Sequence, residues 1–286
     1  MQTFLLYHNP DPIVFEKHIL FLKKHYVITP VSEALSLNSV PSKPAVSITF
    51  DDAYRNNYLN IFPLLQKHSI SAMVFVPTGF IGSIFLPAAL KEAFLKTKKK
   101  NIILSGYGKL VLGTPQNAFD AWHKLIWNII QLPSAERDLK IREILYLLQV
   151  SEDSCTSSKV MSAEELSSLK KVIEIGNHTV THPDMLNLSL EETRFELEVS
   201  KKEIEKLTGQ SCMHFAYPYG KKENYSKQTV LQVEKAGFKF AFTAIPIQSA
   251  KQKPFELARI GIGDKDSVAL LCLKLTPVWP IFWRFS

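Results

Sequence analysis

The sequence is poor in cysteine, and its few cysteines are badly placed for disulfide bonds. Cys155, Cys212 and Cys272 are the only three, and they lie far apart in the 286 residues. An odd and scattered set excludes the disulfide framework that stabilises small secreted domains. We therefore expect small buried thiols and a reducing compartment such as the cytoplasm.

Targeting and nucleic-acid signals are also missing. Residues 1–8 have no basic segment and too short an apolar run for a signal peptide, so we expect a first strand and a cytoplasmic protein. No zinc-finger spacing, RNA-binding signature, internal repeat or low-complexity segment occurs. The net charge of +7 is scattered, and residues 96–100 form the only dense basic run. We therefore predict no nucleic-acid partner, while the positive excess suits a phospholipid surface, a lipid-diphosphate sugar or an acidic glycan.

The chain does contain a regular alternation of strand and helix patterns. Apolar runs predict strands at 3–7, 45–50, 72–76, 172–175, 213–216, 240–243 and 256–262. Helical spacing predicts helices between them, including 54–67, with a kink at Pro63, and 227–235. Alternating strands and helices indicate an α/β fold with a mostly parallel sheet, and we expect residues 1–286 to form one domain.

The alternation breaks between residues 83 and 160. The patterns there predict a hairpin at 102–104 and 110–112, helices at 119–130 and 135–148, and a polar linker at 151–158. An insertion at a strand end overhangs the active face of a barrel, so we predict a substrate wall or a lid. The alternative is an insertion that only packs on the flank.

The most informative stretch is Thr49-Phe50-Asp51-Asp52. It places two adjacent carboxylates at the end of a buried strand. Such carboxylates repel each other and are costly to desolvate, unless a cation lies between them or one of them holds a proton. The pattern therefore indicates a metal site.

Two histidines complete the candidate metal site. His178 and His182 follow the strand pattern at 172–175, and their spacing of four brings both rings together if the segment turns helically. Two imidazoles and one carboxylate leave a coordination position open for water. Zn²⁺ is the expected divalent ion, although Mn²⁺, Ni²⁺, Co²⁺ and Fe²⁺ use the same donors. The alternative for an isolated histidine pair is a structural role.

Taken in order, three motifs resemble those of the polysaccharide deacetylase family, carbohydrate esterase family four. They are Thr49-Phe50-Asp51-Asp52, then His178-Thr179 with His182, then Phe215-Ala216-Tyr217-Pro218-Tyr219-Gly220. The match in order and spacing runs from near residue 3 to about residue 262. The resemblance implies a distorted or incomplete (β/α) barrel, here with a helical and hairpin insertion. It also implies a metal-dependent hydrolase that removes acyl groups from sugars.

The resemblance also implies which residues act at the metal. Asp52, His178 and His182 would be the ligands, and Asp51 would be the general base that takes a proton from water. The alternative for Asp51 is a second ligand or a buried hydrogen-bond acceptor.

The turn that contains Tyr219 would bind the substrate. By resemblance, the backbone N–H of Tyr219 would stabilise the oxyanion, and Tyr217 and Pro218 would contact the sugar. The alternative is a plain turn.

The sequence departs from the commonest family pattern at the general acid. Many members carry a histidine in a late motif, but the similar stretch at 257–264 has none. A subgroup of biofilm-polysaccharide deacetylases instead has a Tyr-His motif on the first strand, and Tyr7-His8 matches that placement. The resemblance therefore implies that His8 is the acid, the alternative being a structural hydrogen bond.

A second departure is Ala216, where many members carry an arginine that orients the catalytic aspartate. We hypothesise that Arg259, near the end of a neighbouring strand, supplies the missing guanidinium to Asp51. The alternative is an ordinary surface ion pair.

The tail, residues 268–286, is apolar and aromatic. Lys274, Pro277 and Pro280 interrupt it, so it is a poor candidate for a membrane-spanning helix. It either packs on the barrel or touches a bilayer surface through Trp279 and Trp283.

The metal-site pattern and the family resemblance together imply a metal-dependent carbohydrate N-deacetylase. Its substrate would be an N-acetylated amino sugar in an oligosaccharide, polysaccharide or glycolipid precursor. One alternative is deformylation or deacylation of another amide, because the metal machinery acts only on an acyl–nitrogen bond. Another is a catalytically weak sugar-binding protein on the same fold.

Overall fold

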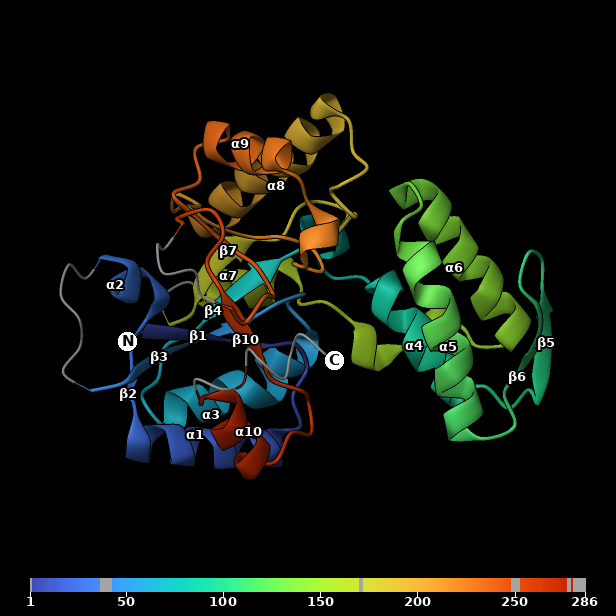
Figure 1. Ribbon diagram of the computed structural model, residues 1–286, viewed down its shortest axis with the longest axis horizontal. Coiled ribbons are helices and arrows are strands. Elements are labelled where there is room, and N and C mark those ends of the chain that lie inside the picture. The colour runs from blue at the N-terminus through green and yellow to red at the C-terminus, as the bar shows by residue number, and fades with distance from the viewer. Residues whose placement is uncertain (1, 37–42, 170–171, 248–252, 277–278, 280–286) are drawn as a thin grey trace.

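A computed structural model describes the chain except for residues 1, 37–42, 170–171, 248–252, 277–278 and 280–286. One parallel sheet forms its centre (Figure 1). Its strands are β1 (Gln2–Tyr7), β2 (Val27–Ile28), β3 (Ala45–Phe50), β4 (Met73–Val76), β7 (Glu174–Asn177), β8 (His214–Ala216), β9 (Phe240–Phe242) and β10 (Arg259–Gly261). Their order is β10-β1-β3-β4-β7-β8-β9, with β2 paired to β3.

The two outer strands of this order almost meet. A single parallel bridge joins Phe242 of β9 to Leu257, just before β10. Two hydrogen bonds of 2.9 Å hold it: the Leu257 N–H donates to the Ala241 carbonyl, and the Thr243 N–H donates to the Leu257 carbonyl. The sheet is therefore a nearly closed barrel, which confirms the expected distorted (β/α) fold.

Helices surround the barrel, as a parallel sheet requires to cover its outer face (Figure 1). They are α1 (Pro12–His25), α2 (Val31–Ser36), α3 (Phe62–Lys67), α7 (Ala163–Leu169), α8 (Leu190–Thr208), α9 (Lys227–Lys235) and α10 (Val268–Lys274). Local signals set their ends. In α8, for example, Ser189 and Glu192 form a reciprocal capping box, and Gly209 ends the helix in the left-handed region at φ 70°.

The barrel interior is filled by a small apolar cluster, which consists of Phe4, Val31, Met73, Phe75, Ala216, Phe242 and Leu257. Gly176 on β7 makes room for one of these rings, because a Cβ there would lie 2.5 Å from Phe75. Arg259 enters the same interior, where its guanidinium lies 5.3 Å from the ring of Phe75. A buried cation among aromatic rings needs an anion nearby, which leads to the site described below.

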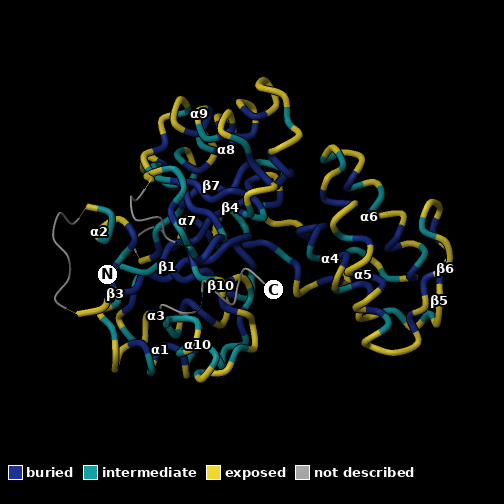
Figure 2. Tube along the Cα trace, in the orientation of Figure 1, coloured by how far each residue is buried: buried dark blue, intermediate teal, exposed yellow. Residues whose placement is uncertain are grey.

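The insertion at 83–160 packs together at one side of the barrel (Figure 1). It contains α4 (Leu86–Lys96), the hairpin β5 (Asn101–Leu104) and β6 (Gly108–Val111), α5 (Pro115–Ile130) and α6 (Ser134–Leu148). Figure 2 shows buried chain on the inner sides of its three helices. The chain enters and leaves the insertion side by side, because Ile84 forms an antiparallel bridge with Lys159.

Two elements differ from the sequence prediction. The helix expected at 54–67 is present from residue 55 to Lys67, but Asn57–Ile61 within it form a π-helical turn, and Pro63 lies in the first turn of α3. Proline lacks an N–H, so it fits the start of a helix better than its middle. The strand expected at 172–175 is shifted to Glu174–Asn177, which places His178 directly after it.

Only part of the apolar tail lies within the described residues. Residues 268–274 form α10, whose Leu271 is buried, and the ammonium of Lys274 lies 5.4 Å from the ring centre of Trp279. Residues 277–278 and 280–286, including Trp283, lie outside the described part. Among the described helices, none combines the length and apolar character needed to cross a bilayer.

Candidate metal centre and active site

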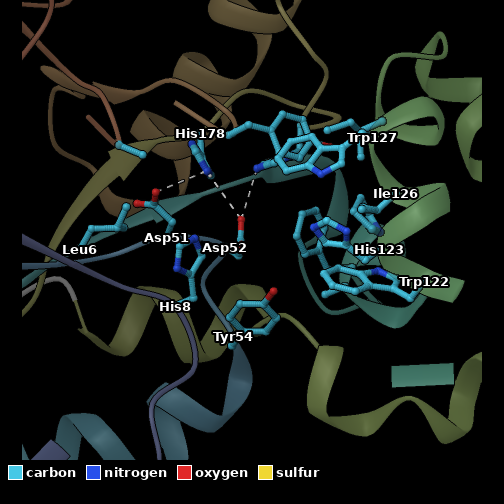
Figure 3. Close-up of a pocket in the computed structure, with 17 residues that line it drawn as sticks. Leu6, His8, Asp51, Asp52, Tyr54, Trp122, His123, Ile126, Trp127 and His178 are labelled. Atoms are coloured by element: carbon cyan, nitrogen blue, oxygen red, sulfur yellow. Dashed lines mark ion pairs between the residues drawn. The ribbon is translucent and has the colours of Figure 1, made fainter. Parts of the chain in front are cut away.

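The predicted site residues meet at one end of the barrel. Asp51 and Asp52 follow β3, and His178 follows β7. Parallel strands bring their carboxyl ends to one edge, so these side chains converge there (Figure 3).

Three of these side chains form a buried cluster suited to a metal ion. One possible ligand atom from each of Asp52, His178 and His182 lies within 4.8 Å of the other two. The Oδ1 atom of Asp52 is 3.6 Å from His178 Nε2 and 3.4 Å from His182 Nε2. These distances leave room for one ion between the three atoms.

The hydrogen bonds of the cluster also fit a cation. His178 Nδ1 lies 2.8 Å from the carbonyl of Ala216, which makes Nδ1 the donor and leaves the Nε2 lone pair free to bind a metal. The Oδ1 atom of Asp52 is buried and has no hydrogen-bond partner among the described residues. Burial raises the pKa of Asp52 above its usual value, against the influence of His8 and His178. A divalent ion would supply the missing partner and keep this carboxylate ionised.

The loop that carries the two histidines is not helical, which corrects the sequence prediction. The rings still converge, with centroids 4.7 Å apart, because Thr179 and His182 both adopt left-handed backbone angles, at φ 69° and 53°. The carboxylate of Glu196 holds this loop by accepting hydrogen bonds from the backbone N–H groups of Val180, at 2.7 Å, and Thr181, at 2.9 Å.

Backbone strain is concentrated at the site. Seven described residues other than glycine have a positive φ, and five of them lie here: Asp52, Ala53, Thr179, His182 and Tyr219. Such conformations cost energy and persist where the surrounding structure holds them for a function. The distribution therefore favours a functional site over a structural histidine pair.

Asp51 is bound by a buried arginine. Arg259 is fully buried and donates from Nη1 to Asp51 Oδ1 and from Nη2 to Oδ2, each at 2.7 Å. Its Nε donates to the carbonyl of Thr243 at 2.9 Å. Burial alone would raise the pKa of Asp51, but the charges of Arg259 and His178 hold it below its usual value. The hypothesised contact of Arg259 with Asp51 is therefore present, and it keeps this carboxylate ionised.

A pocket of about 270 Å³ lies over these groups. Figure 3 shows Asp51, Asp52 and His178 on one side of it and side chains of α5 on the other. The residues of the insertion that line it are Phe85, Pro87, Ala88, Trp122, His123, Ile126, Trp127 and Ile130. The insertion thus supplies the wall that faces the candidate metal site.

Comparison with protein families agrees with this geometry. The family profile described as "Polysaccharide deacetylase" matches residues 38–98 and 141–241, more than half of the chain. The chain belongs to the polysaccharide deacetylase family. The unmatched stretch between the two segments, residues 99–140, contains α5 and the first half of α6.

Known proteins show the same relationship. The chain is 21% identical over 254 residues to the Bacillus subtilis protein YxkH, whose name assigns it to the polysaccharide deacetylases. The match covers 87% of this chain but 64% of that protein, so the chain spans less than two thirds of its relative.

Solved structures resemble this chain in fold. The Streptococcus pyogenes deacetylase PplD, solved in complex with acetate, matches with a TM-score of 0.62 and 20% identity, over 96% of this chain and 98% of that one. A de-N-acetylase from Aggregatibacter actinomycetemcomitans matches with a TM-score of 0.60 and 14% identity, over 96% and 99%. At such identities the likeness shows the shared barrel fold.

The structure brings two further predicted residues of this chain to the pocket. His8 directly follows β1 and lines the pocket beside the two aspartates (Figure 3). The ring of Tyr219 also lines it, 4.6 Å from the ring of His182. The Tyr219 backbone N–H donates to no acceptor among the described residues. The chemical roles of His8 and Tyr219 stay predictions.

Tyr217 and Pro218 are buried and are not among the residues that line this pocket, so their contact with a substrate stays a prediction. Side chains alternate across a strand, and that of Tyr217 points into the outer helical layer. Its ring stacks on Tyr225 at 4.3 Å, and its hydroxyl donates to the carbonyl of Phe255 at 3.0 Å.

Sequence reasoning missed Arg137 of α6. This fully buried residue donates from Nη1 to the carbonyl of His182 and from Nη2 to that of Thr181, both at 2.8 Å. The insertion is therefore bound to the histidine loop as well as facing it. In the sequence, Arg137 is one of several charged residues in a helical pattern, and nothing distinguishes it as buried.

Proposed function

We propose that this chain is a metal-dependent hydrolase that removes the N-acetyl group from an amino sugar. One observation carries the proposal. A buried cluster of Asp52, His178 and His182, with an unpaired carboxylate oxygen, lies beside a second aspartate that an arginine keeps ionised. Membership of the polysaccharide deacetylase family supports an acetylated carbohydrate as the substrate.

The donor set determines which ion is expected. Two neutral imidazole nitrogens and one carboxylate suit Zn²⁺ and other first-row divalent ions. When bound, such an ion supplies Lewis-acid activation of water and of the acyl oxygen. Burial keeps His182 neutral, because it holds the pKa of that imidazole well below its usual value, and the charges of His178 and Arg137 add to this effect.

The remaining residues have complementary tasks in amide hydrolysis. Asp51 accepts a proton from the attacking water, because its pairing with Arg259 leaves it ionised. The Tyr219 N–H donates to the oxygen that becomes negatively charged on the acyl carbon. His8 donates a proton to the nitrogen as the carbon–nitrogen bond breaks, which gives acetate and a free amine.

The test is acetate release from N-acetylglucosamine oligomers by the protein with a chelator, and then with Zn²⁺, Mn²⁺, Ni²⁺, Co²⁺ or Fe²⁺ added back. We expect release that the chelator abolishes and at least one ion restores. The control is His182→Ala, which should stay inactive with every ion. Saturable sugar binding without acetate release under all ions would instead indicate a sugar-binding protein and contradict the proposal.

A further inference from the structure

The insertion covers the pocket with an almost entirely apolar surface. We call this surface the apolar wall, and it consists of Phe85, Pro87, Ala88, Trp122, Ile126, Trp127 and Ile130. The opposite side of the pocket carries the carboxylates and imidazoles of the candidate metal site (Figure 3). The pocket therefore has a polar side for chemistry and an apolar side with no part in that chemistry.

The apolar wall offers few hydrogen-bond partners to further sugar rings, although the flat faces of its two indole rings can stack on a sugar. Sugar hydroxyl groups that leave water need hydrogen-bond partners, and an unpaired buried hydroxyl is costly. Next to the wall, the polar groups on α5 are the imidazole of His123 and the indole N–H groups of Trp122 and Trp127. A hydrocarbon chain needs no such partners and gains free energy from burial on this surface.

Two lysines lie against the indole rings of the apolar wall. The ammonium of Lys221 lies 4.3 Å from the ring centre of Trp127, and that of Lys91 lies 5.2 Å from the ring centre of Trp122. Both are cation–π contacts, in which the ammonium group itself lies over the ring. Positive charge therefore lies beside the two indole rings of the apolar wall.

The size of the pocket points the same way. Its volume of about 270 Å³ lies just below the range of small-molecule sites, which is about 300–1,000 Å³. It holds about one sugar ring, and the rest of a substrate extends beyond it along the apolar wall. In addition, α5 lies in the stretch that the family profile does not match, so the family pattern does not account for it.

We propose that the substrate is amphipathic: an N-acetylated amino sugar that carries a hydrocarbon chain, with the chain on the apolar wall. This inference rests on the proposed function and names the substrate class of the same site. The reacting acetamido group faces Asp52 and the two histidines. The helix α5 selects the substrate by contacting the hydrocarbon chain attached to the sugar.

The test compares the methyl and octyl β-glycosides of N-acetylglucosamine, and N-acetylglucosamine oligomers, in the metal-loaded enzyme. We expect kcat/KM to rise about two- to fourfold for each methylene that the wall buries, and the oligomers to react more slowly than the octyl glycoside. Trp127→Ala should bring the octyl-to-methyl ratio close to one, and Trp127→Phe should restore most of it. The matched control is Tyr146→Ala, an aromatic residue of α6 that is 82% exposed and outside the pocket.

Binding to chelator-treated protein, measured by calorimetry, separates the two proposals. If no substrate releases acetate but the octyl glycoside binds more tightly than the methyl glycoside, the proposed function fails and the amphipathic substrate stands. If acetate is released but chain length affects neither rate nor binding, or the oligomers react fastest, the apolar wall serves sugar rings and this inference is overturned.

A separate observation concerns the histidine loop. The geometry points to Arg137 as a positioning residue for His182, provided that the proposed metal site exists. The carbonyls of Thr181 and His182 both accept from its guanidinium, and its Nε donates to Asp138 at 2.8 Å. A second contact joins the same elements, because the hydroxyl groups of Ser134 and Thr181 lie 2.7 Å apart.

The physical reason lies in the backbone of the loop. His182 has a left-handed φ of 53°, which a histidine rarely adopts unless other groups hold it. One planar guanidinium binds two successive carbonyls and so fixes the peptide that joins Thr181 to His182. A lysine supplies a point charge and cannot bridge both carbonyls with the same geometry.

Metal affinity, measured by competition with a chelating dye, tests this role. We expect Arg137→Met to weaken binding about 10- to 100-fold and to change the absorption spectrum of the Co²⁺-loaded protein, and Arg137→Lys to lie between it and the wild type. The control is Arg142→Met on the same helix, whose side chain is 53% exposed. If Arg137→Met does not fold, Arg137→Lys is decisive, and unchanged metal affinity in the folded variant overturns the inference. If the wild type binds no metal, faster amide exchange at residues 178–182 in Arg137→Lys still supports the positioning role, and unchanged exchange overturns it.

Discussion

The buried pair of Arg259 and Asp51 allows a quantitative prediction about stability. Arg259→Met removes a guanidinium that is fully buried and leaves the carboxylate of Asp51 buried without its charge partner. Breaking a buried ion pair from one side costs about 3–5 kcal/mol. Since domains of this kind are stable by about 5–15 kcal/mol, the variant should fold but lose a large part of its stability.

The double variant separates the charge effect from packing. Asp51→Asn alone leaves Arg259 buried and unpaired, so it should also cost about 3–5 kcal/mol. With both substitutions no unpaired charge remains, and we expect the combined loss to be smaller than the sum of the two by about 2–3 kcal/mol. The assay is urea unfolding of chelator-treated proteins at neutral pH, which excludes differences in metal binding from the comparison.

A matched control is Arg142→Met, which removes a guanidinium from a largely exposed pair with Glu152. Exposed pairs contribute about 0–1 kcal/mol, so this loss should be small. The reasoning is refuted if Arg259→Met costs no more than Arg142→Met, or if the losses at positions 51 and 259 simply add. Unchanged turnover in Arg259→Ala would in turn remove Arg259 from the mechanism.

Four further predictions follow from the site and its surroundings. Asp51→Asn should lower kcat about 10²–10⁴-fold and leave metal affinity nearly unchanged, as initial rates and metal titration would show; loss of the metal would make Asp51 a ligand instead. His182→Ala should lose the metal, and a variant that keeps wild-type affinity would contradict the ligand assignment. His8→Ala should lower kcat more for substrates with a poor leaving amine, and an equal effect on all substrates would contradict its role as acid. Burial lowers the pKa of His214 from 6.5 to about 4. As the pH falls below about 6.5, His214 becomes protonated in the unfolded chain but stays neutral in the folded protein. The free energy of unfolding should therefore fall by up to ~3 kcal/mol between about pH 6.5 and pH 4. His214→Gln should reduce this loss in urea unfolding at pH 7 and pH 5, and an identical loss would refute the assignment.

The sequence predicted the position of a site residue correctly where a reactive side chain directly follows a strand pattern. Asp51 and Asp52 come directly after an apolar, β-branched run, and such runs end at the carboxyl edge of a parallel sheet. That single fact places both carboxylates at the active face. The same reasoning placed His8 correctly, because β1 ends at Tyr7.

The sequence did not predict the position of a side chain where contacts between distant parts of the chain determine it. Arg137 and Arg142 lie on the same helix, and the sequence around them is similar. Arg137 is nevertheless fully buried, whereas Arg142 is largely exposed. The difference arises from a loop 45 residues away, whose carbonyls accept from Arg137. Likewise, the convergence of the histidine rings depends on left-handed angles at Thr179 and His182, which neither residue type predicts.

The guanidinium beside Asp51 illustrates how a barrel can relocate a functional group. The resemblance to other family members places an arginine at position 216, on β8, where this chain has alanine. Ala216 lies in the interior cluster with Phe75 and Phe242, and its small side chain leaves space there. Arg259 of β10 enters that interior, 5.3 Å from the ring of Phe75 and 5.9 Å from that of Phe242. Because all parallel strands present interior residues toward the same axis, Asp51 requires a guanidinium that reaches it from within the barrel and does not require a particular strand to supply it.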